Sequence, residues 1–425
     1  MNGAERNAVP AKRTWLARMV EWAFAVAGLL VLSDVRGELP IKPHRLIVAA
    51  GLAPPAAGPD LLRWTVFAIT AVFLVVRGRK VVTLMKAGWP VVLLVILAAV
   101  SVFWSADPVL SSARVVRIAG TTAFGLFLAS RFTLEDQLRI AASTLGILAL
   151  VSAFLIFAMP GYGKFGPLGW IGIFEWKNFF GRNMVLAMLV FLLLSDFSGR
   201  WRVVPIAGTL LCAVLVIGSR SRASTFTAFA SLAAVCVFAL AQRLPEQKRL
   251  RAMRAFAIAA VALVLLVATQ AHRLLPYFQG GETLNLRMAL WSVLLQKAAL
   301  HPWFGYGYGA FWRGNAGVSG EVEQIVHFYP YHAHNGFLEI ALDLGAIGFL
   351  VFLLPLIGYV RRATRRAMAR PLLARLWPLT LLVYLLLINQ MYSALMWSNL
   401  NWALYVAAMV SIMASPNGAG AAENS

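Results

Sequence analysis

Apolar runs of near membrane-spanning length recur along almost the whole chain. A transmembrane helix needs about 20 mostly apolar residues, and about twelve runs approach that length. They are residues 15–33, 61–76, 84–103, 115–130, 136–158, 179–196, 203–218, 223–241, 253–270, 336–360, 373–391 and 395–414. The first run continues into charged residues with no small-residue cleavage site, so we expect a first span there rather than a signal peptide. The pattern predicts an all-α, polytopic membrane protein.

The basic residues orient these predicted spans. Of the 38 Lys and Arg residues, 23 fall on one side of the membrane when the N-terminus is placed in the cytoplasm. Cytoplasmic loops are enriched in Lys and Arg, so both termini are predicted to be cytoplasmic. The formal net charge of +21 would indicate a nucleic-acid-binding protein in a soluble chain. With 60% hydrophobic and 13% charged residues, and most charges between apolar runs, that class is excluded.

One connection is much longer than the others. Residues 271–335 are rich in aromatic, glycine and polar residues, and a loop of this length in a compact protein is usually functional. The orientation places it in the periplasm. Within it, residues 287–300 carry apolar residues near helical spacing and predict a short amphipathic helix on the membrane surface. The expected organisation is therefore nine spans in 1–270, this loop, three spans in 336–414, and a cytoplasmic tail in 415–425.

Three of the six histidines lie at the end of this loop: His327, His332 and His334. His334 directly precedes the tenth predicted span, with Asn335 or Gly336 near the helix cap. A helix N-terminus disfavours imidazolium, so a histidine there tends to be neutral and able to accept a proton as a general base. The alternative is a histidine that only caps the helix or meets lipid headgroups. A three-histidine zinc site is a further alternative, but the spacing is a weak signal and we predict no metal.

Arginines on the same predicted side are candidates for binding phosphate. Arg220 and Arg222 lie in the short turn GSRSRAST, residues 218–225, and Arg287 begins the predicted amphipathic helix. The guanidinium fork binds phosphate through two hydrogen bonds, whereas arginines at helix ends also simply reach the membrane interface.

The loop at residues 164–182 on that side mixes glycine and aromatic residues with Lys164, Lys177, Asn178 and Arg182. This mixture suits a rim that faces lipid or sugar. Taken singly, each of its basic residues is expected to be an interface anchor.

Together these features suit a lipid-linked diphosphate. Its tail would lie between helices, its phosphates on arginines, and sugars would stack on the aromatic residues of the rim. The sequence contains no nucleotide-binding loop or metal-binding D-x-D motif, so no cofactor is expected.

Several motifs carry a family resemblance. In chain order they are FWSADP (103–108), FEWKNFFG (174–181), the S-x-S-R turn ending at Arg222, R-x-x-x-W from Arg287 to Trp291, HPWFGYGYGAF (301–311) and HNGFLEIALDLGAIG (334–348). The ordered set, which runs over most of the chain, resembles the O-antigen ligase/polymerase superfamily of bacterial inner-membrane glycosyltransferases.

The resemblance implies an O-antigen ligase. Such an enzyme transfers a glycan from undecaprenyl pyrophosphate to a sugar hydroxyl of lipid A–core on the periplasmic face, without metal or cofactor, and completes lipopolysaccharide. Direct attack at the anomeric carbon would invert its configuration. By resemblance, His334 activates the acceptor hydroxyl, and Arg222 and Arg287 hold the pyrophosphate. Auxiliary candidates complete the set: Arg220, Lys177 and Arg313.

Three alternatives remain at this point. An O-antigen polymerase would use a second lipid-linked repeat as acceptor, and a protein-glycosylating relative would use Ser or Thr. A lipid or polysaccharide transporter, from another class, would also explain the spans and the basic residues. The halves of the chain show no convincing repeat of the kind that many transporters carry, which favours the enzyme.

Overall fold

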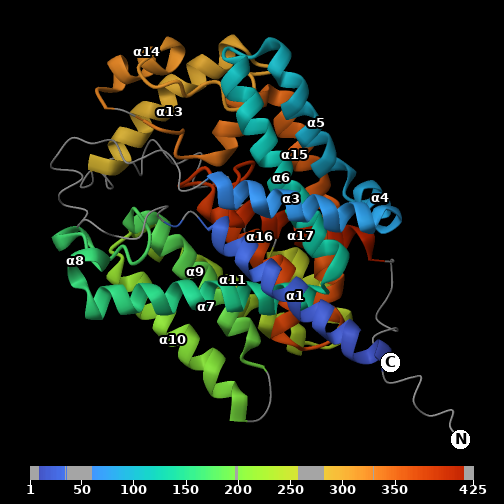
Figure 1. The fold of residues 1–425 in the computed structure, drawn as a ribbon. Coiled ribbons are helices and arrows are strands. Elements are labelled where there is room, and N and C mark those ends of the chain that lie inside the picture. The colour runs from blue at the N-terminus through green and yellow to red at the C-terminus, as the bar shows by residue number, and fades with distance from the viewer. Residues whose placement is uncertain are drawn as a thin grey trace, which may run out of the picture.

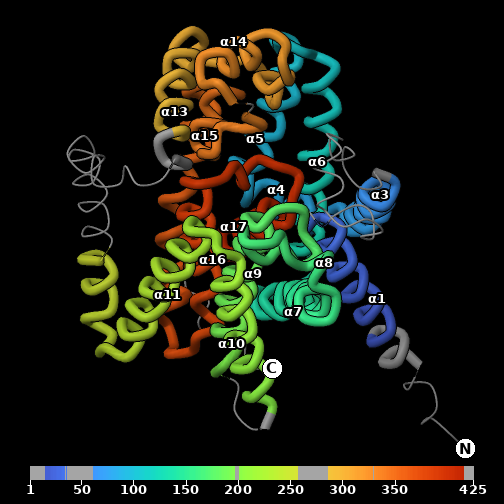
Figure 2. Tube along the Cα trace, turned by 90° about the vertical axis from the view of Figure 1, so that its left-hand side faces the viewer, coloured from blue at the N-terminus to red at the C-terminus, as the bar shows by residue number. Residues whose placement is uncertain are grey.

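The computed structural model describes residues 9–33, 35, 60–196, 200–256, 282–328 and 330–415. These residues form helices, joined by turns and two isolated β-bridges, and none of them belongs to a strand (Figures 1 and 2). The N-terminal elements are α1 (Val9–Val31), α3 (Asp60–Val76), α4 (Gly78–Ala87), α5 (Trp89–Val100), η1 (Ser101–Trp104), α6 (Pro108–Arg131), α7 (Leu134–Ala158), α8 (Pro160–Gly163) and η2 (Gly166–Leu168). The all-α prediction is confirmed for the described residues.

The remaining elements follow in the second part of the chain. They are α9 (Lys177–Leu194), η3 (Arg200–Arg202), α10 (Val203–Gly218), α11 (Arg222–Arg243), α13 (Glu282–Leu300), α14 (Gly317–Val326), α15 (Gly336–Ala369), η5 (Leu373–Leu376), α16 (Trp377–Ile388) and α17 (Leu400–Ala414). The predicted ninth span, residues 253–270, lies mostly outside the described residues.

The predicted number of about twelve spans is not confirmed. Within the described residues, four helices are long and apolar enough to cross a membrane: α7, α9, α11 and α15. A fifth span is possible if α3 and α4, which meet at a bend of 100°, count as one. Other apolar runs form shorter helices, such as α5 and α16 with 12 residues each and α17 with 15. Hydropathy alone does not show where an apolar run breaks into shorter helices, so the number of spans stays a prediction.

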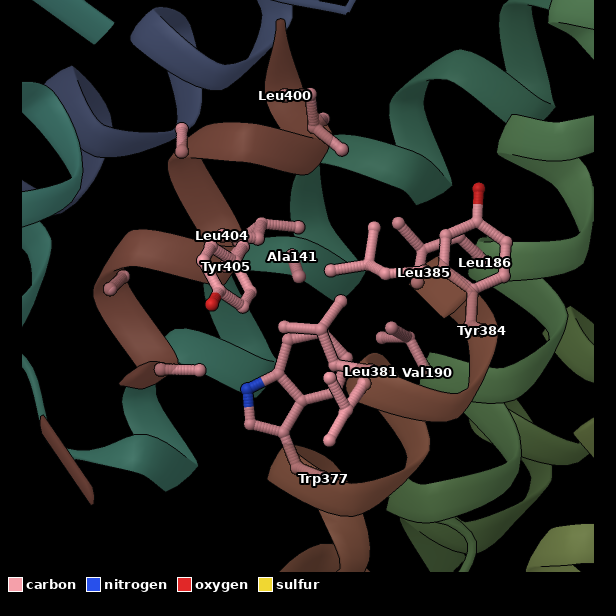
Figure 3. Close-up of a cluster of buried hydrophobic side chains, with 14 of the residues drawn as sticks. Ala141, Leu186, Val190, Trp377, Leu381, Tyr384, Leu385, Leu400, Leu404 and Tyr405 are labelled. Atoms are coloured by element: carbon pink, nitrogen blue, oxygen red, sulfur yellow. The ribbon is translucent and has the colours of Figure 1, made fainter. Parts of the chain in front are cut away.

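Helix α17 lies inside the bundle. Its side chains are buried on every face, as expected for a helix that is apolar all round. Figure 3 shows the packing of this core. Its labelled residues come from α7 (Ala141), α9 (Leu186, Val190), α16 (Trp377, Leu381, Tyr384, Leu385) and α17 (Leu400, Leu404, Tyr405). The site described below is therefore held on a closely packed frame.

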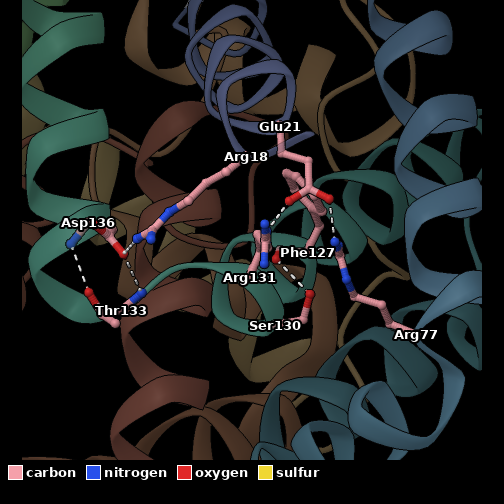
Figure 4. A network of polar contacts seen from close by, with 8 residues as sticks. All are labelled: Arg18, Glu21, Arg77, Phe127, Ser130, Arg131, Thr133 and Asp136. Carbon is pink, nitrogen blue, oxygen red and sulfur yellow. Dashed lines mark hydrogen bonds and ion pairs between the residues drawn. The ribbon is translucent and has the colours of Figure 1, made fainter. Parts of the chain in front are cut away.

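Ion pairs join α1 to the neighbouring helices. Glu21 of α1 accepts hydrogen bonds from Arg77, after α3, and from Arg131, at the end of α6 (Figure 4). Arg18 of α1 also pairs with Asp136 of α7 at 3.3 Å. These contacts lie on the side of the molecule that the sequence predicts to be cytoplasmic.

Helix α15 is broken near its start. Gly345 has φ +65°, which interrupts the helical path, and a Cβ there would lie 2.3 Å from the Trp303 carbonyl carbon. A glycine is needed because the 301–311 segment packs directly against the break. Tyr306 N–H donates to the Leu342 carbonyl at 2.8 Å, and Ala346 N–H donates to the Pro302 carbonyl at 2.8 Å. The first segment of α15 is thus joined to the loop that also carries α13 and α14, at one end of the molecule (Figure 1).

Large apolar side chains cover much of the outer surface. Many are more than half exposed, including Val75, Phe103, Val109, Phe229 and Ile357. A soluble monomer rarely exposes apolar surface on this scale, whereas lipid-facing helices must do so. The structure therefore supports a membrane protein.

Candidate active site

His334 lies in the short coil between α14 and α15. The residue before it, Ala333, forms hydrogen bonds through both its carbonyl and its N–H group. Trp291 Nε1, from α13, donates to the Ala333 carbonyl at 2.8 Å. Ala333 N–H donates to Glu339 Oε2, also at 2.8 Å. His334 has φ +51°, a left-handed conformation that non-glycine residues adopt rarely and only where the surroundings enforce it. We call the Trp291–Ala333–Glu339 contact set the Ala333 clamp, since it fixes the backbone from which His334 projects.

Glu339 connects this coil to two other segments. Its Oε1 accepts a hydrogen bond from Trp312 Nε1 at 2.6 Å, and its Oε2 also accepts one from Ser393 Oγ at 3.1 Å. The side chain is 3% exposed. Buried carboxylates need such partners, because an unpaired one is costly. Glu339 therefore joins the loop before α14, the His334 coil and the α16–α17 loop at one point.

Two asparagines fix the start of α15. Asn335 is its N-cap, and its Oδ1 accepts from the N–H groups of Phe337 and Leu338 at 3.0 and 3.2 Å. This confirms the cap expected next to His334. Gly336 N–H donates to the Asn389 carbonyl at 2.8 Å, and a Cβ on Gly336 would lie 2.2 Å from Asn389 Oδ1. Only glycine allows the α16–α17 loop to approach so closely.

The two histidines of the H-x-H pair contact each other. His334 N–H donates to His332 Nδ1 at 3.0 Å, and the ring centroids are 4.1 Å apart in an edge-to-face arrangement. Because Nδ1 of His332 accepts, its neutral ring carries the proton on Nε2. His334 Nδ1 is buried and has no hydrogen-bond partner among the described residues. His332 is thus oriented by the backbone, whereas Nδ1 of His334 is not occupied by a hydrogen bond within the described residues.

Two arginines from different helices approach this pair. Arg287, the predicted ligand on α13, is partly buried, and its Nη1 lies 3.3 Å from Met391 Sδ. Arg182, on α9, is 3% exposed. Its guanidinium carbon lies 4.4 Å from the Phe179 ring centroid and 5.9 Å from that of Tyr392. Arg287 forms no ion pair with a carboxylate within the described ranges, so its charge remains available to an anion.

The environment keeps both imidazoles neutral. Burial, and then the positive charge of Arg287, lowers the pKa of His334 to about 4. Burial lowers the pKa of His332 well below its ordinary value, with further contributions from His334, Arg182 and Arg287. Both arginines therefore lie close enough to His332 to act on it electrostatically. The arrangement offers a neutral proton acceptor beside concentrated positive charge, which suits an anionic ligand.

The S-x-S-R turn borders the same cluster. Ser221 is the N-cap of α11, and its Oγ donates to Asn178 Oδ1 at 2.9 Å and lies 3.3 Å from the Tyr392 hydroxyl. Tyr392 in turn packs near Arg182. The turn between α10 and α11 is thus connected to the arginine and histidine cluster through Tyr392.

The two arginines of that turn, Arg220 and Arg222, have different surroundings. Arg222 is the first residue of α11, and its side chain is exposed. Arg220 has φ +51° and donates from Nη1 to the Pro167 carbonyl at 2.8 Å, so it is engaged by the loop before α9. His334 and Arg287 lie close enough to interact electrostatically, and the S-x-S-R turn reaches the same cluster through Tyr392.

The auxiliary candidates Lys177 and Arg313 lie on other elements than the histidine pair. Lys177 is half-buried at the start of α9. Arg313 donates to the Ala106 carbonyl at 3.0 Å and so joins the α13–α14 loop to the segment before α6. His327 is the exposed C-cap of α14. Within the ranges that the structure covers, no three His, Cys, Asp or Glu side chains are grouped so that they could hold a metal ion.

Sequence reasoning missed the importance of Arg182, Tyr392 and Glu339. Arg182 had a signal: it is the fourth residue of the predicted span 179–196, and a charged residue within an apolar helix is commonly functional. Tyr392 and Glu339 had none, because their roles depend on contacts with distant segments.

Comparison with known proteins finds relatives of the part of the chain that carries much of this site. Residues 207–353 match the O-antigen ligase family, a segment that includes the S-x-S-R turn, Arg287 and His334. The exopolysaccharide production protein ExoQ of Rhizobium meliloti is 26% identical over 278 residues, which cover 62% of this chain and 62% of that protein.

Two shorter matches are to provisionally named polysaccharide ligases. That of Rickettsia prowazekii is 28% identical over 78 residues, covering 18% of this chain and 19% of that protein. That of Rickettsia felis is 30% identical over 79 residues, again covering 18% and 19%. The chain thus aligns with less than two thirds of each of these relatives. The family match, the relatives and the ordered motifs together support a relationship to the O-antigen ligase/polymerase superfamily.

Proposed function

We propose that this chain is an O-antigen ligase. It would transfer a glycan from undecaprenyl pyrophosphate to a sugar hydroxyl of lipid A–core, on the periplasmic face of the bacterial inner membrane. The observation that supports this best is the neutral His334 beside Arg287 and the buried Arg182. A proton acceptor next to an anion site is what glycan transfer from a diphosphate carrier requires.

The proposed step is a single displacement. The acceptor hydroxyl oxygen forms a bond to the anomeric carbon of the donor, and the bond from that carbon to the diphosphate oxygen breaks. The hydroxyl proton passes to His334, and the bonding electrons leave with the diphosphate. Attack from the face opposite the leaving group inverts the anomeric configuration. Guanidinium groups stabilise the charge that grows on the diphosphate, so the proposed reaction needs no metal.

Donor binding would also change the pKa of His334. A group with a pKa of about 4 is a weak base near neutral pH, and general bases work best when their pKa is near the operating pH. Arg287 contributes to the low pKa of His334. A diphosphate bound to Arg287 would offset that charge and raise the pKa of His334. The base would thus gain strength when the donor is present.

We assign the diphosphate to Arg287 and Arg222, with Arg182 as an additional ligand. Arg287 and Arg182 lie next to the histidines. Arg222 directly follows Ser221, which contacts Tyr392 of the same cluster, and its exposed side chain is free to turn toward a bound donor. Arg220, Lys177 and Arg313 remain auxiliary candidates.

A polar pocket in the same loop supports a glycan ligand. It has a volume of about 370 Å³, and its lining combines amide, carboxylate and imidazole groups with one aromatic ring: Asn315, Gly320, Glu323, Gln324, His327 and Phe328. Planar polar groups bind sugar hydroxyls, and an aromatic ring packs on the apolar face of a sugar. Phe328 is six residues from His334, at most about 20 Å of extended chain, so one glycan of a few sugars would reach from this pocket to the base.

The test is transfer by the purified protein in detergent. It is given lipid-linked glycan and lipid A–core, and we expect ligated lipopolysaccharide. His334→Ala should abolish transfer while donor binding is retained, and Arg287→Ala or Arg222→Ala should weaken donor binding. His301→Ala, which changes an exposed histidine of the same loop, is the matched control and should remain active. Full transfer by His334→Ala would refute the role of His334 as the general base.

A second candidate function is O-antigen polymerase. One relative is named for exopolysaccharide production rather than for ligation. The same assay separates the two functions by product. A longer lipid-linked glycan made without lipid A–core would indicate the polymerase and contradict the ligase.

A further inference from the structure

A basic pocket lies at the bend between α3 and α4, away from the residues assigned to glycan transfer. It has a volume of about 670 Å³. It is lined by Val76, Arg77, Gly78, Arg79, Lys80, Ser130 and Arg131. The pocket therefore lies where the ends of α3 and α6 meet the start of α4, on the side that the sequence predicts to be cytoplasmic.

The pocket carries excess positive charge. Four of its lining residues are cations, and the one carboxylate paired with them in the described part of the chain is Glu21. Four cations and one carboxylate leave three positive charges. Glu21 is 7% exposed and binds Arg77 and Arg131, which fixes both guanidinium groups in place (Figure 4).

The other two cations are free to meet a ligand. Arg79 and Lys80 are exposed, and neither side chain has a hydrogen-bond or ion-pair partner among the described residues. Like charges held close together repel one another, and this repulsion is relieved when an anion binds between them.

An apolar face leads directly to this pocket. Val72, Val75 and Val76 lie at helical spacing on α3 and are 63%, 80% and 78% exposed. In a membrane protein such a face contacts acyl chains. The apolar face ends at Val76, which is itself a lining residue of the pocket. Apolar surface and cationic pocket thus follow each other as the tail and the headgroup phosphate do in a phospholipid.

We propose that this pocket binds the phosphate of an anionic phospholipid, with an acyl chain along Val72, Val75 and Val76. Basic pockets between transmembrane helices on the cytoplasmic side bind anionic headgroups for the same electrostatic reason. Through Glu21, Arg77 and Arg131, the lipid would join α1, the α3–α4 bend and α6. The site is independent of the glycan-transfer reaction, and its test does not require activity.

The experiment measures thermal unfolding of the full-length protein in detergent micelles. Phosphatidylglycerol is titrated in, with phosphatidylcholine as the neutral lipid and inorganic phosphate as the free anion. A ligand that binds only the folded state raises the unfolding temperature. We expect phosphatidylglycerol to stabilise the protein, whereas phosphatidylcholine and inorganic phosphate should not.

The critical variant is Arg79→Ser/Lys80→Ser. Each cation near an anionic surface contributes about fivefold in affinity, so the double variant should need about 25-fold more phosphatidylglycerol for half-maximal stabilisation. The matched control is Arg361→Ser/Arg365→Ser, which removes two exposed cations from α15 on the same predicted side. It should respond like the unaltered protein. Lys80→Ser alone, with an expected fivefold loss, provides the same test if the double variant fails to fold.

Three results would overturn the proposal. The first is that phosphatidylglycerol stabilises the unaltered protein no more than phosphatidylcholine does. The second is that the α15 control variant loses as much response as the pocket variant, which would indicate general surface charge. The third is that inorganic phosphate alone gives the full effect, which would identify a free anion rather than a lipid as the ligand.

Discussion

Glu339→Gln is the most direct test of whether the Ala333 clamp positions His334. The substitution keeps the shape of the side chain but replaces one carboxylate oxygen with an NH₂ group. In the structure each oxygen accepts from an N–H group that cannot itself accept: Oε1 from Trp312 and Oε2 from Ala333. Glutamine can satisfy only one of them. The other buried N–H is left facing a second donor.

The expected size of the effect follows from that lost acceptor. A buried donor without a partner costs about 1–3 kcal/mol. At about 2 kcal/mol, the ratio of clamped to released coil falls about 30-fold. We therefore expect kcat to fall by up to about 30-fold. The KM for the lipid-linked donor should change little, because Arg182 and Arg287 lie on α9 and α13 rather than on the released coil.

The assay is glycan transfer to lipid A–core, with kcat and donor KM determined separately. Ser393→Ala is the matched control, since it removes one hydroxyl donor to Oε2 and leaves both N–H contacts intact. Its kcat should stay within about threefold of the unaltered protein. Unchanged kcat in Glu339→Gln, or an equal loss in Ser393→Ala, would refute the positioning role of the clamp.

Two further predictions concern the histidine and the arginines. Because the pKa of His334 is lowered to about 4, the free enzyme keeps this base unprotonated well below neutral pH, and kcat/KM should stay level from pH 7.5 to 5.5. A histidine of ordinary pKa would be only about 9% unprotonated at pH 5.5, and kcat/KM would then fall about tenfold. Such a loss, in a protein shown to remain folded at pH 5.5, would contradict the lowered pKa of His334. Arg182→Lys keeps the charge but loses the planar fork that lies over Phe179, so we expect the donor KM to rise about tenfold with kcat largely retained. The control is Arg243→Lys, at the exposed end of α11; an equal change in both variants would argue against a donor contact at Arg182.

The sequence determined the features that depend on near neighbours. Apolar runs specified helices, and the N-cap of α15 at Asn335 and the helix around Arg287 were both expected from their own segments. Motif order indicated the family, and the comparisons support it. The roles of His334 and Arg222 remain predictions, although the structure places the first of them beside Arg287.

Only the tertiary structure decided what shares a site. Arg182 looked like an interface anchor until the fold placed it near His332, and Glu339 gained its role from Trp312 and Ser393. The structure also showed that residues 78–87 form a helix, α4, bent by 100° from α3, largely where the sequence predicted the loop between the spans 61–76 and 84–103. Hydrophobic periodicity reports whether a segment is helical because that depends on residues a few positions apart. It does not report which buried polar groups meet, because those contacts join segments tens to hundreds of residues apart and form only when the helices pack.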